Sequence, residues 1–270
     1  MPTIEDNLRL WNEEFDWSRQ GEEWSSGWGG SEAQWYGTLF PRMHAFLPAH
    51  CILEIAPGYG RWTQMLKGHC EKLAVVDLAD SCIEACKKRF HKDTHITYHV
   101  NDGKSLAMIE DTTIDFVFSF DSLVHAEKDV VQTYLAQLAR KLTPNGVGFI
   151  HHSNIGMYVD PSTGELPCFL PNDHGRATSM TARRFKEFCS AVGLQCMAQE
   201  LVNWGANAAL IDCLSLFTPR NSVWARPNRI FINAGFMNEA SYLRKVMTLY
   251  TCQSHVRADR QQLGAERRDT

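Results

Sequence analysis

The sequence predicts an α/β fold in which a doubly wound, mostly parallel sheet carries helices on both faces. Short apolar runs alternate with amphipathic segments between residues 49 and 218, and this alternation is typical of repeated β-α-β units. The chain has 270 residues, of which 44% are hydrophobic. A chain of this size can bury one large core, with or without a small cap.

The elements are predicted in order from hydrophobic periodicity and from the turn residues between the segments. Strands are expected at residues 51–56, 72–78, 96–100, 114–120, 146–153, 194–203 and 209–217. Helices are expected at residues 61–70, 79–91, 130–142 and 181–193. These elements form a core at residues 49–218. A cap or lid at residues 1–48 precedes it, and an extension at residues 219–270, with a strand at 228–233 and a helix at 238–250, packs on it.

Composition and charge exclude several classes of protein. The formal net charge of -4 gives no general attraction to nucleic acids or to anionic membranes. No apolar run approaches the roughly 18 residues of a membrane span, and the acidic start lacks the apolar segment of a signal peptide. Nine cysteines without a CxxC pair favour reduced thiols in a cytoplasmic protein. A small-molecule partner is therefore expected, and a homo-oligomer is compatible with the sequence.

The loop after the first strand, APGYGRW, is the first candidate for a binding site. In open α/β sheets ligands bind at the carboxyl ends of the strands, and Gly58 and Gly60 would let the backbone turn tightly and a ligand approach it. A dinucleotide fingerprint would need a third glycine where this chain has Thr63. Glu54 suits a ligand with cationic groups better than a pyrophosphate, which it would repel.

The next two strand ends carry further polar residues. Asp77 lies near the place where an acid binds ribose hydroxyls, although an aspartate there can also cap the following helix. Asn101 and Asp102 follow the third strand and could hydrogen-bond an adenine amine, or form an Asx turn before Gly103.

Four segments in this order, LEIAPGYGRW, VVDL, VNDG and FVFSFDSLVH, resemble the motifs of class I S-adenosylmethionine (SAM)-dependent methyltransferases. The resemblance covers roughly residues 50–218 and implies SAM as the methyl donor. It also implies a Rossmann-like, seven-stranded sheet whose last strand is antiparallel. Ala56 and Asn145 stand where the family often has glycine, and Ala56 is small enough to be tolerated. The resemblance implies Glu54, Gly58 and Gly60 around the methionine moiety, Asp77 at the ribose and Asp102 at the adenine. Asn101, beside Asp102, and Ser119, on the rim, are further candidates for cofactor binding.

Candidates for the methyl-accepting end of the site follow the fourth and fifth strands. Because side chains alternate along a strand, only one of the adjacent His151 and His152 can face the cleft. We expect His152 to face it and to act as general base for a hydroxyl acceptor, with His125 as the substitute. Any of these histidines can instead be a hydrogen-bonded packing residue. The remaining candidates are Asp121 for catalysis, and His151 and Asn154 for substrate binding.

A metal site is the weaker interpretation of this rim. Asp121, His152, Asp173 and His174 could supply ligands if the loop at residues 155–175 folded over the site. No tight ligand spacing is visible, so no metal is predicted.

The tryptophan-rich start has two interpretations. Five of the eight tryptophans precede residue 49, which fits either helices packed on the sheet or a lid that presents Trp24, Trp28 and Trp35 to the acceptor. Arg42 and His44 could contact polar groups of the acceptor. The long loop at residues 155–178 belongs to the same region.

The leading prediction is an O-methyltransferase acting on a small polar acceptor, such as a sugar, a glycan unit or a natural product. The first alternative is an N-methyltransferase acting on a small amine, whose site needs a carboxylate or an aromatic cage more than a histidine base. A non-catalytic SAM-binding protein and a nicotinamide-dependent dehydrogenase are the remaining alternatives.

Overall fold

The computed structural model describes residues 2–205 and 208–250. Its centre is an eight-stranded sheet with the order β3-β2-β1-β4-β5-β7-β6-β8. The strands are β1 (Ala49–Ile55), β2 (Cys70–Asp77), β3 (Ile96–Val100), β4 (Ile114–Ser119), β5 (Leu142–Ser153), β6 (Leu194–Val202), β7 (Asp212–Pro219) and β8 (Arg229–Asn233). The α-helices are α1 (Ile4–Arg9), α2 (Ser31–Gln34), α3 (Phe40–Met43), α4 (Thr63–Leu66), α5 (Asp80–Arg89), α6 (Lys128–Lys141), α7 (Ala182–Ala191) and α8 (Phe236–Tyr250).

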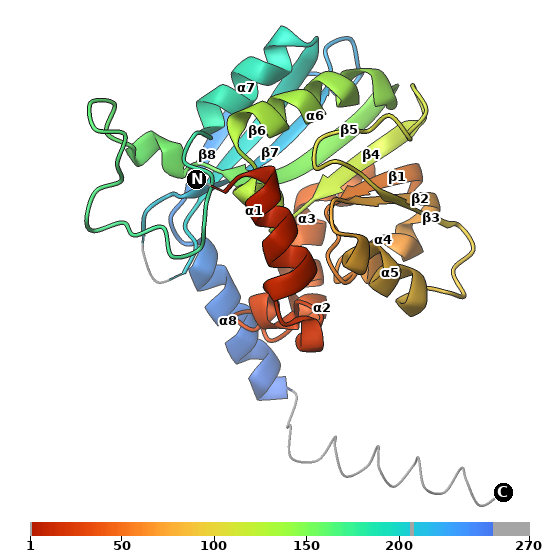
Figure 1. The fold of residues 1–270 in the computed structure, drawn as a ribbon, viewed down its shortest axis with the longest axis horizontal. Coiled ribbons are helices and arrows are strands. Elements are labelled where there is room, and N and C mark those ends of the chain that lie inside the picture. The colour runs from red at the N-terminus through yellow and green to blue at the C-terminus, as the bar shows by residue number, and fades with distance from the viewer. Residues whose placement is uncertain (1, 206–207, 251–270) are drawn as a thin grey trace, which may run out of the picture.

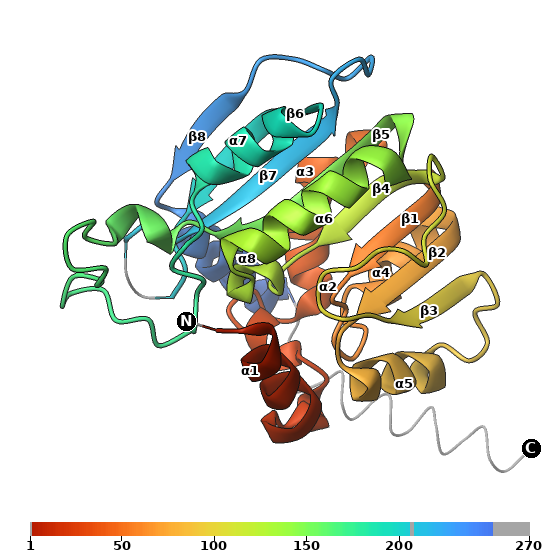
Figure 2. The same cartoon turned by 45° about the horizontal axis from the view of Figure 1, so that its top comes forward.

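Helices cover both faces of the sheet, which confirms the predicted fold class (Figures 1 and 2). On one face, Leu53 of β1 belongs to the same apolar cluster as Leu135 of α6. On the other face, Ile52 shares a cluster with Phe90, which follows α5, and with Phe236 of α8. Adjacent residues of β1 thus point to opposite layers, as a parallel strand buried on both faces requires.

The sheet has one strand more than the resemblance implied. β7 runs antiparallel to both β5 and β6, as expected for the last strand of a seven-stranded sheet. β8 then pairs in parallel with β6 and adds an eighth strand at the edge. The local sequence predicted β8 as a strand, but its hydrogen-bonding partner lies far away in the chain, and local periodicity carries no information on such pairing.

The first 48 residues divide into two parts with different surroundings. Trp28 and Trp35 are 1% and 0% exposed and belong to the core between the sheet and α8. The indole of Trp28 donates a hydrogen bond to Thr38 Oγ1 at 2.9 Å. We call residues 28–46 the wedge. The expectation that Trp28 and Trp35 bind an acceptor is wrong, because core side chains enclose both indoles.

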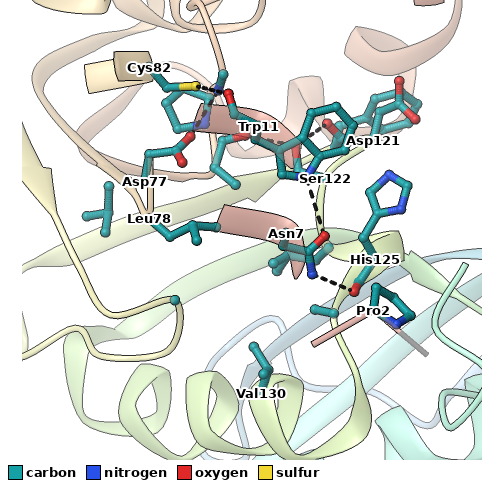
Figure 3. Close-up of a pocket in the computed structure, with 18 of the residues that line it drawn as sticks. Pro2, Asn7, Trp11, Asp77, Leu78, Cys82, Asp121, Ser122, His125 and Val130 are labelled. Atoms are coloured by element: carbon teal, nitrogen blue, oxygen red, sulfur yellow. Dashed lines mark hydrogen bonds between the residues drawn. The ribbon is translucent and has the colours of Figure 1, made fainter. Parts of the chain in front are cut away.

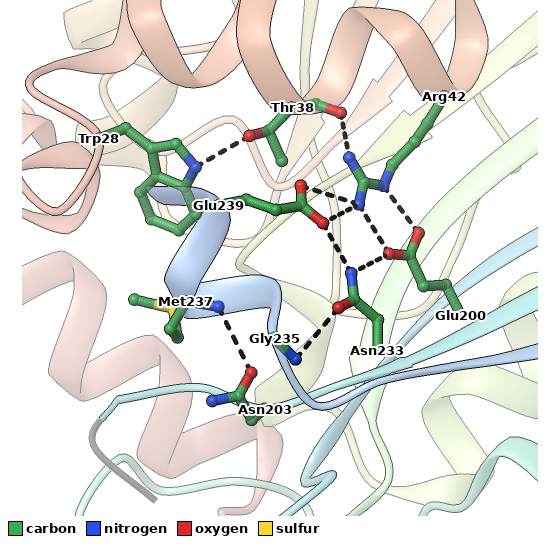
Figure 4. A network of polar contacts seen from close by, with 9 residues as sticks. All are labelled: Trp28, Thr38, Arg42, Glu200, Asn203, Asn233, Gly235, Met237 and Glu239. Carbon is green, nitrogen blue, oxygen red and sulfur yellow. Dashed lines mark hydrogen bonds and ion pairs between the residues drawn. The ribbon is translucent and has the colours of Figure 1, made fainter. Parts of the chain in front are cut away.

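A polar network fastens the wedge to the sheet and to α8 (Figure 4). Arg42 Nε and Nη2 donate to the Glu200 carboxylate at 2.7 and 2.6 Å, and Nη2 also donates to Glu239 Oε1 at 3.1 Å. Arg42 is therefore engaged by two carboxylates of the protein and is not available to contact a methyl acceptor. His44 is exposed, with its Nδ1 3.1 Å from the carbonyl oxygen of Pro41.

Candidate functional site

A pocket lies at the carboxyl ends of β1, β2 and β4, the edge at which open parallel sheets bind ligands. The empty space that it encloses, open solvent included, is about 940 Å³. The end of β2 contributes Asp77 to its wall, and the loops after β1 and β4 contribute Gly58 and Asp121. Side chains from the start of the chain complete the wall (Figure 3). We call residues 2–24 the roof.

The two glycines of the APGYGRW loop have different roles. Both have left-handed backbone conformations, with φ of 57° at Gly58 and 81° at Gly60. A Cβ on Gly58 would lie 2.7 Å from Trp17 of the roof, whereas a Cβ on Gly60 would lie 2.5 Å from Phe90. Gly58 lines the pocket and Gly60 does not. Gly60 therefore lets the loop pack on the α5 layer, and Gly58 lets the roof approach the loop.

Asp77 at the end of β2 is the carboxylate best placed for a ribose. Its Oδ2 accepts a hydrogen bond from the backbone N–H of Gly58 at 3.1 Å, and its Oδ1 accepts one from that of Ala79 at 2.9 Å. Burial raises the pKa of Asp77 to about 6, while these backbone hydrogen bonds act in the opposite direction. Each oxygen keeps acceptor capacity for a ligand hydroxyl.

Glu54 lies behind the pocket rather than in its wall. The side chain is buried, and its Oε2 accepts a hydrogen bond from Thr63 Oγ1 at 2.6 Å. Burial raises the pKa of Glu54 to about 8, so the carboxyl group is mostly protonated at neutral pH. The structure thus contradicts the expectation that an ionised Glu54 faces cationic groups of the ligand.

At the β3 end, the residues that line the pocket are neighbours of those predicted. Asn101 Oδ1 accepts a hydrogen bond from the backbone N–H of Gly103 at 2.9 Å, and Asp102 Oδ1 accepts one from that of Lys104 at 3.1 Å. These contacts correspond to the Asx-turn alternative, and both side chains lie outside the lining. Gly103 and Tyr134 line the pocket instead.

Ser119 and Asn154 also lie outside the lining. Ser119 is fully buried at the end of β4. Asn154 Nδ2 donates to the carbonyl oxygen of Leu210 at 2.8 Å, and its Oδ1 accepts from the backbone N–H of Ala182 at the same distance. Asn154 therefore joins the end of β5 to α7 and is not placed to contact an acceptor.

Three tryptophans of the roof line the pocket: Trp11, Trp17 and Trp24. Trp17 stacks on Tyr59 of the glycine loop, with ring centroids 4.6 Å apart and planes 3° from parallel. Its Nε1 donates to the carbonyl oxygen of Trp11 at 2.8 Å. Trp24 was expected at the site, whereas Trp11 and Trp17 were not singled out, because sequence alone does not separate the tryptophans of the roof from those of the wedge.

Asn7 connects the roof to the loop after β4 (Figure 3). Its Nδ2 donates to the carbonyl oxygen of His125 at 3.2 Å, and its Oδ1 accepts from Trp11 Nε1 at 3.3 Å. A Cβ on Gly103 would lie 2.9 Å from Ile4 Cγ2. The roof therefore contacts the loops that follow β1, β3 and β4.

His125 is the histidine that lines the pocket. Its Nδ1 lies 3.0 Å from the carbonyl oxygen of Gly175, so Nδ1 carries the proton and Nε2 is left as an acceptor. Burial, together with the nearby charge of Arg176, lowers the pKa of His125 to about 4. His125 is thus a neutral hydrogen-bond acceptor in the wall.

His151 and His152 point to opposite faces of the sheet, as strand alternation predicts. His152 stacks on Phe185 of α7, with centroids 4.3 Å apart and planes 2° from parallel, and its Nε2 lies 2.9 Å from Ser215 Oγ. Burial lowers the pKa of His152 to about 4. The choice of His152 as the general base is wrong, because its ring packs beneath α7 and does not reach the pocket.

His151 lies behind the pocket wall and supports Asp121. Its Nδ1 accepts a hydrogen bond from the backbone N–H of Asp121 at 3.1 Å, and its Nε2 lies 3.3 Å from Asp212 Oδ2. Asp121 in turn lines the pocket and pairs with Arg61, with Oδ2 3.0 Å from Nη2. Sequence reasoning missed Arg61, although it directly follows the second glycine of the loop.

The metal interpretation finds no geometric support. Within residues 2–205 and 208–250, no group of three or more histidine, cysteine or acidic side chains could hold a metal ion. Asp121 pairs with Arg61 while His152 faces α7, so these two proposed ligands do not meet. Over the same residues, no helix is long and apolar enough to cross a membrane.

Comparison with known proteins agrees with this architecture. The family model described as "Methyltransferase domain" matches residues 52–146. Nodulation protein S of Rhizobium tropici is 29% identical over 106 residues, which are 37% of this chain and 41% of that protein. Phosphoethanolamine N-methyltransferase 1 of Triticum aestivum is 29% identical over 119 residues, 42% of this chain and 24% of that protein. The chain thus spans less than half the length of these curated relatives.

Solved structures show the same fold at low sequence identity. N-methyltransferase NodS from Bradyrhizobium japonicum WM9 superposes with a TM-score of 0.51 at 18% identity, over 70% of this chain and 96% of that one. A geranyl diphosphate methyltransferase superposes with a TM-score of 0.54 at 16% identity, over 80% of this chain and 98% of that one.

A mostly parallel sheet with an antiparallel β7, and a pocket with an acid at the end of β2, are the features of the methyltransferase fold. Residues 52–146 match the methyltransferase domain, and SAM is the methyl donor that the class I family implies. The residues present fit SAM. Asp77 has acceptor capacity for the ribose hydroxyls, and pyrophosphate-binding cations are not needed for this ligand.

Proposed function

We propose that the protein transfers a methyl group from SAM to the nitrogen of a small amine. The observation that carries this choice is His125, a neutral imidazole in the pocket wall whose pKa is held at about 4. So weak a base accepts a hydrogen bond but does not readily remove a proton from a hydroxyl group. A neutral amine already has the lone pair that attacks the methyl carbon, so it needs orientation more than deprotonation.

The aromatic roof supports an amine acceptor. Trp11, Trp17 and Trp24 present indole rings to the pocket, and indole faces attract cationic groups such as the sulfonium of SAM or a methylated ammonium product. The names of two similar proteins, Phosphoethanolamine N-methyltransferase 1 and N-methyltransferase NodS, favour the same choice. An amine acceptor therefore replaces the hydroxyl acceptor as our leading proposal.

In this mechanism the chain positions its ligands and excludes water. Asp77 fixes the ribose, the roof closes the pocket, and His125 Nε2 accepts a hydrogen bond from the amine N–H and orients its lone pair. Bound SAM supplies the electrophilic methyl group. Such orientation accounts for roughly 7–11 kcal/mol of a barrier in well-aligned reactions.

A hydroxyl acceptor is the second candidate, because His125 Nε2 is an acceptor for an O–H as well as for an N–H. The test is turnover with SAM and matched pairs of small amines and alcohols that share a carbon skeleton. The readouts are the formation of the demethylated product S-adenosylhomocysteine and the mass of the methylated acceptor. N-methyl products from the amines alone are expected. Methyl ethers from the alcohols, with unreacted amines, would overturn the proposal.

A further inference from the structure

The pocket wall includes the carboxylates of Asp77 and Asp121. Asp77 lies on one side, and Figure 3 shows Asp121 well separated from it, with the Trp11 side chain drawn between them. Arg61, Trp24 and Trp62 belong to the same lining as Asp121. We propose that the buried Arg61–Asp121 pair binds the amino-acid end of SAM, with Arg61 taking the carboxylate and Asp121 the ammonium group.

Arg61 is held rigidly but retains hydrogen-bond donors. Its Nη1 donates to Ser25 Oγ at 2.9 Å and its Nη2 to Asp121 Oδ2 at 3.0 Å. The guanidinium carbon lies 4.6 Å from the centre of the Trp62 ring and 5.2 Å from that of Trp24. A guanidinium has five N–H donors, and these bonds use two of them. A carboxylate is the ligand group that matches such a fork.

Asp121 is held as firmly and retains an acceptor. Its φ of 62° is unusual for a residue with a side chain, and the backbone N–H is fixed by the bond to His151 Nδ1 at 3.1 Å. Asp212 lies behind His151 and accepts two hydrogen bonds from Arg176, at 3.0 and 2.8 Å. Of the two carboxylate oxygens of Asp121, only Oδ2 accepts a hydrogen bond from the described residues, and Oδ1 keeps its acceptor capacity.

The charges of the pair match those of the ligand. Arg61 and Asp121 are almost fully buried and neutralise each other, so a ligand group with a single charge would bring an uncompensated charge into the buried site. The amino-acid end of SAM carries both an ammonium and a carboxylate. It adds one charge of each sign, and therefore leaves the pocket neutral. This inference rests on the assignment of SAM as the cofactor and is independent of the acceptor.

Calorimetry with two probes tests the proposal on the full chain. S-adenosylhomocysteine (SAH) carries the amino-acid end, and 5′-methylthioadenosine lacks it. Arg61→Gln should weaken SAH binding about 10- to 100-fold, the range of charged hydrogen bonds, and change 5′-methylthioadenosine binding less than about 3-fold. Asp121→Asn should act in the same direction. Arg89→Gln is the matched control, because Arg89 donates to the carbonyl oxygen of Tyr59 and lies outside the lining.

Each outcome decides between explanations. Equal losses for both probes, or no loss for either, would overturn the proposal, since Arg61 would then act on the loop or on the acceptor. If Arg61→Gln does not fold, Arg61→Lys, which keeps the charge and loses the fork, must lower the preference for SAH over 5′-methylthioadenosine. Wild-type protein that binds neither probe would refute the cofactor itself. Wild-type protein that binds both probes equally would refute only this inference.

Discussion

The roof and the wedge are neighbours in the sequence and are both rich in tryptophan, yet their indoles do different things. In the wedge, Trp28 and Trp35 are enclosed by the core between the sheet and α8. In the roof, Trp11 and Trp17 pack on each other and face the pocket, with ring centroids 6.1 Å apart. A high tryptophan content therefore indicates that a segment packs against the rest of the protein. Whether an indole stabilises the fold or closes a site depends on its position in the tertiary structure.

The largest expected effect separates the two regions by stability. Trp35→Ala should lower the free energy of unfolding by about 3–5 kcal/mol, because it empties a fully buried site. Trp17→Ala should cost less than Trp35→Ala, because the Trp17 ring is only partly buried. Urea unfolding followed by far-ultraviolet circular dichroism measures both. Equal losses would show that the roof is as much a part of the core as the wedge.

His152 lies in the core and His125 lies beneath the roof, and the two can be compared in the same way. Burial holds the pKa of His152 at about 4, below its unfolded value of 6.5. The unfolded chain therefore binds more protons between these pH values, and stability falls as the pH is lowered from 6.5 to 4, by roughly 3 kcal/mol for one such group. His152→Phe keeps the stacking on Phe185 and should flatten this fall.

His125→Phe is the matched variant, because burial gives His125 the same pKa of about 4. It should flatten the acid destabilisation as well, but only this variant should also impair turnover. Unfolding measured from pH 4 to 7 and initial rates at pH 7.5 provide the two readouts. Loss of turnover in His152→Phe with full SAH affinity would return His152 to the catalytic site.

The smallest effect concerns closure of the pocket. Trp17→Ala removes the ring that stacks on Tyr59 and should weaken SAH binding about 3- to 10-fold, the equivalent of an aromatic contact. Tyr36→Ala removes an exposed ring from the wedge and should leave the affinity unchanged. Calorimetry gives both values. Hydrogen exchange sharpens the result, since SAH should slow exchange in residues 2–24 and leave residues 31–46 as they are. Equal protection with and without SAH would make the roof a fixed layer.

Much of the site was predictable where a backbone motif fixes it. Gly58 and Asp77 line the pocket as predicted, because each lies at the end of a strand whose position the hydrophobic pattern gives. Residues one or two positions away were less predictable. Asn101 and Asp102 form turns while Gly103 faces the pocket. Ala56 was judged by its size, but its φ of 58° places the cost in the backbone.

Local sequence patterns were enough to predict the order of strands and helices along the chain, the class of the domain and the edge of the sheet that carries the pocket. Periodicity and motif spacing are local, and the carboxyl ends of parallel strands must meet at one edge. The tertiary structure decided which of two adjacent histidines faces the pocket, which tryptophans leave the core, and that Arg61 meets Asp121. These outcomes depend on side-chain direction and on contacts between distant segments. A shift of one residue along a strand reverses the face to which a side chain points.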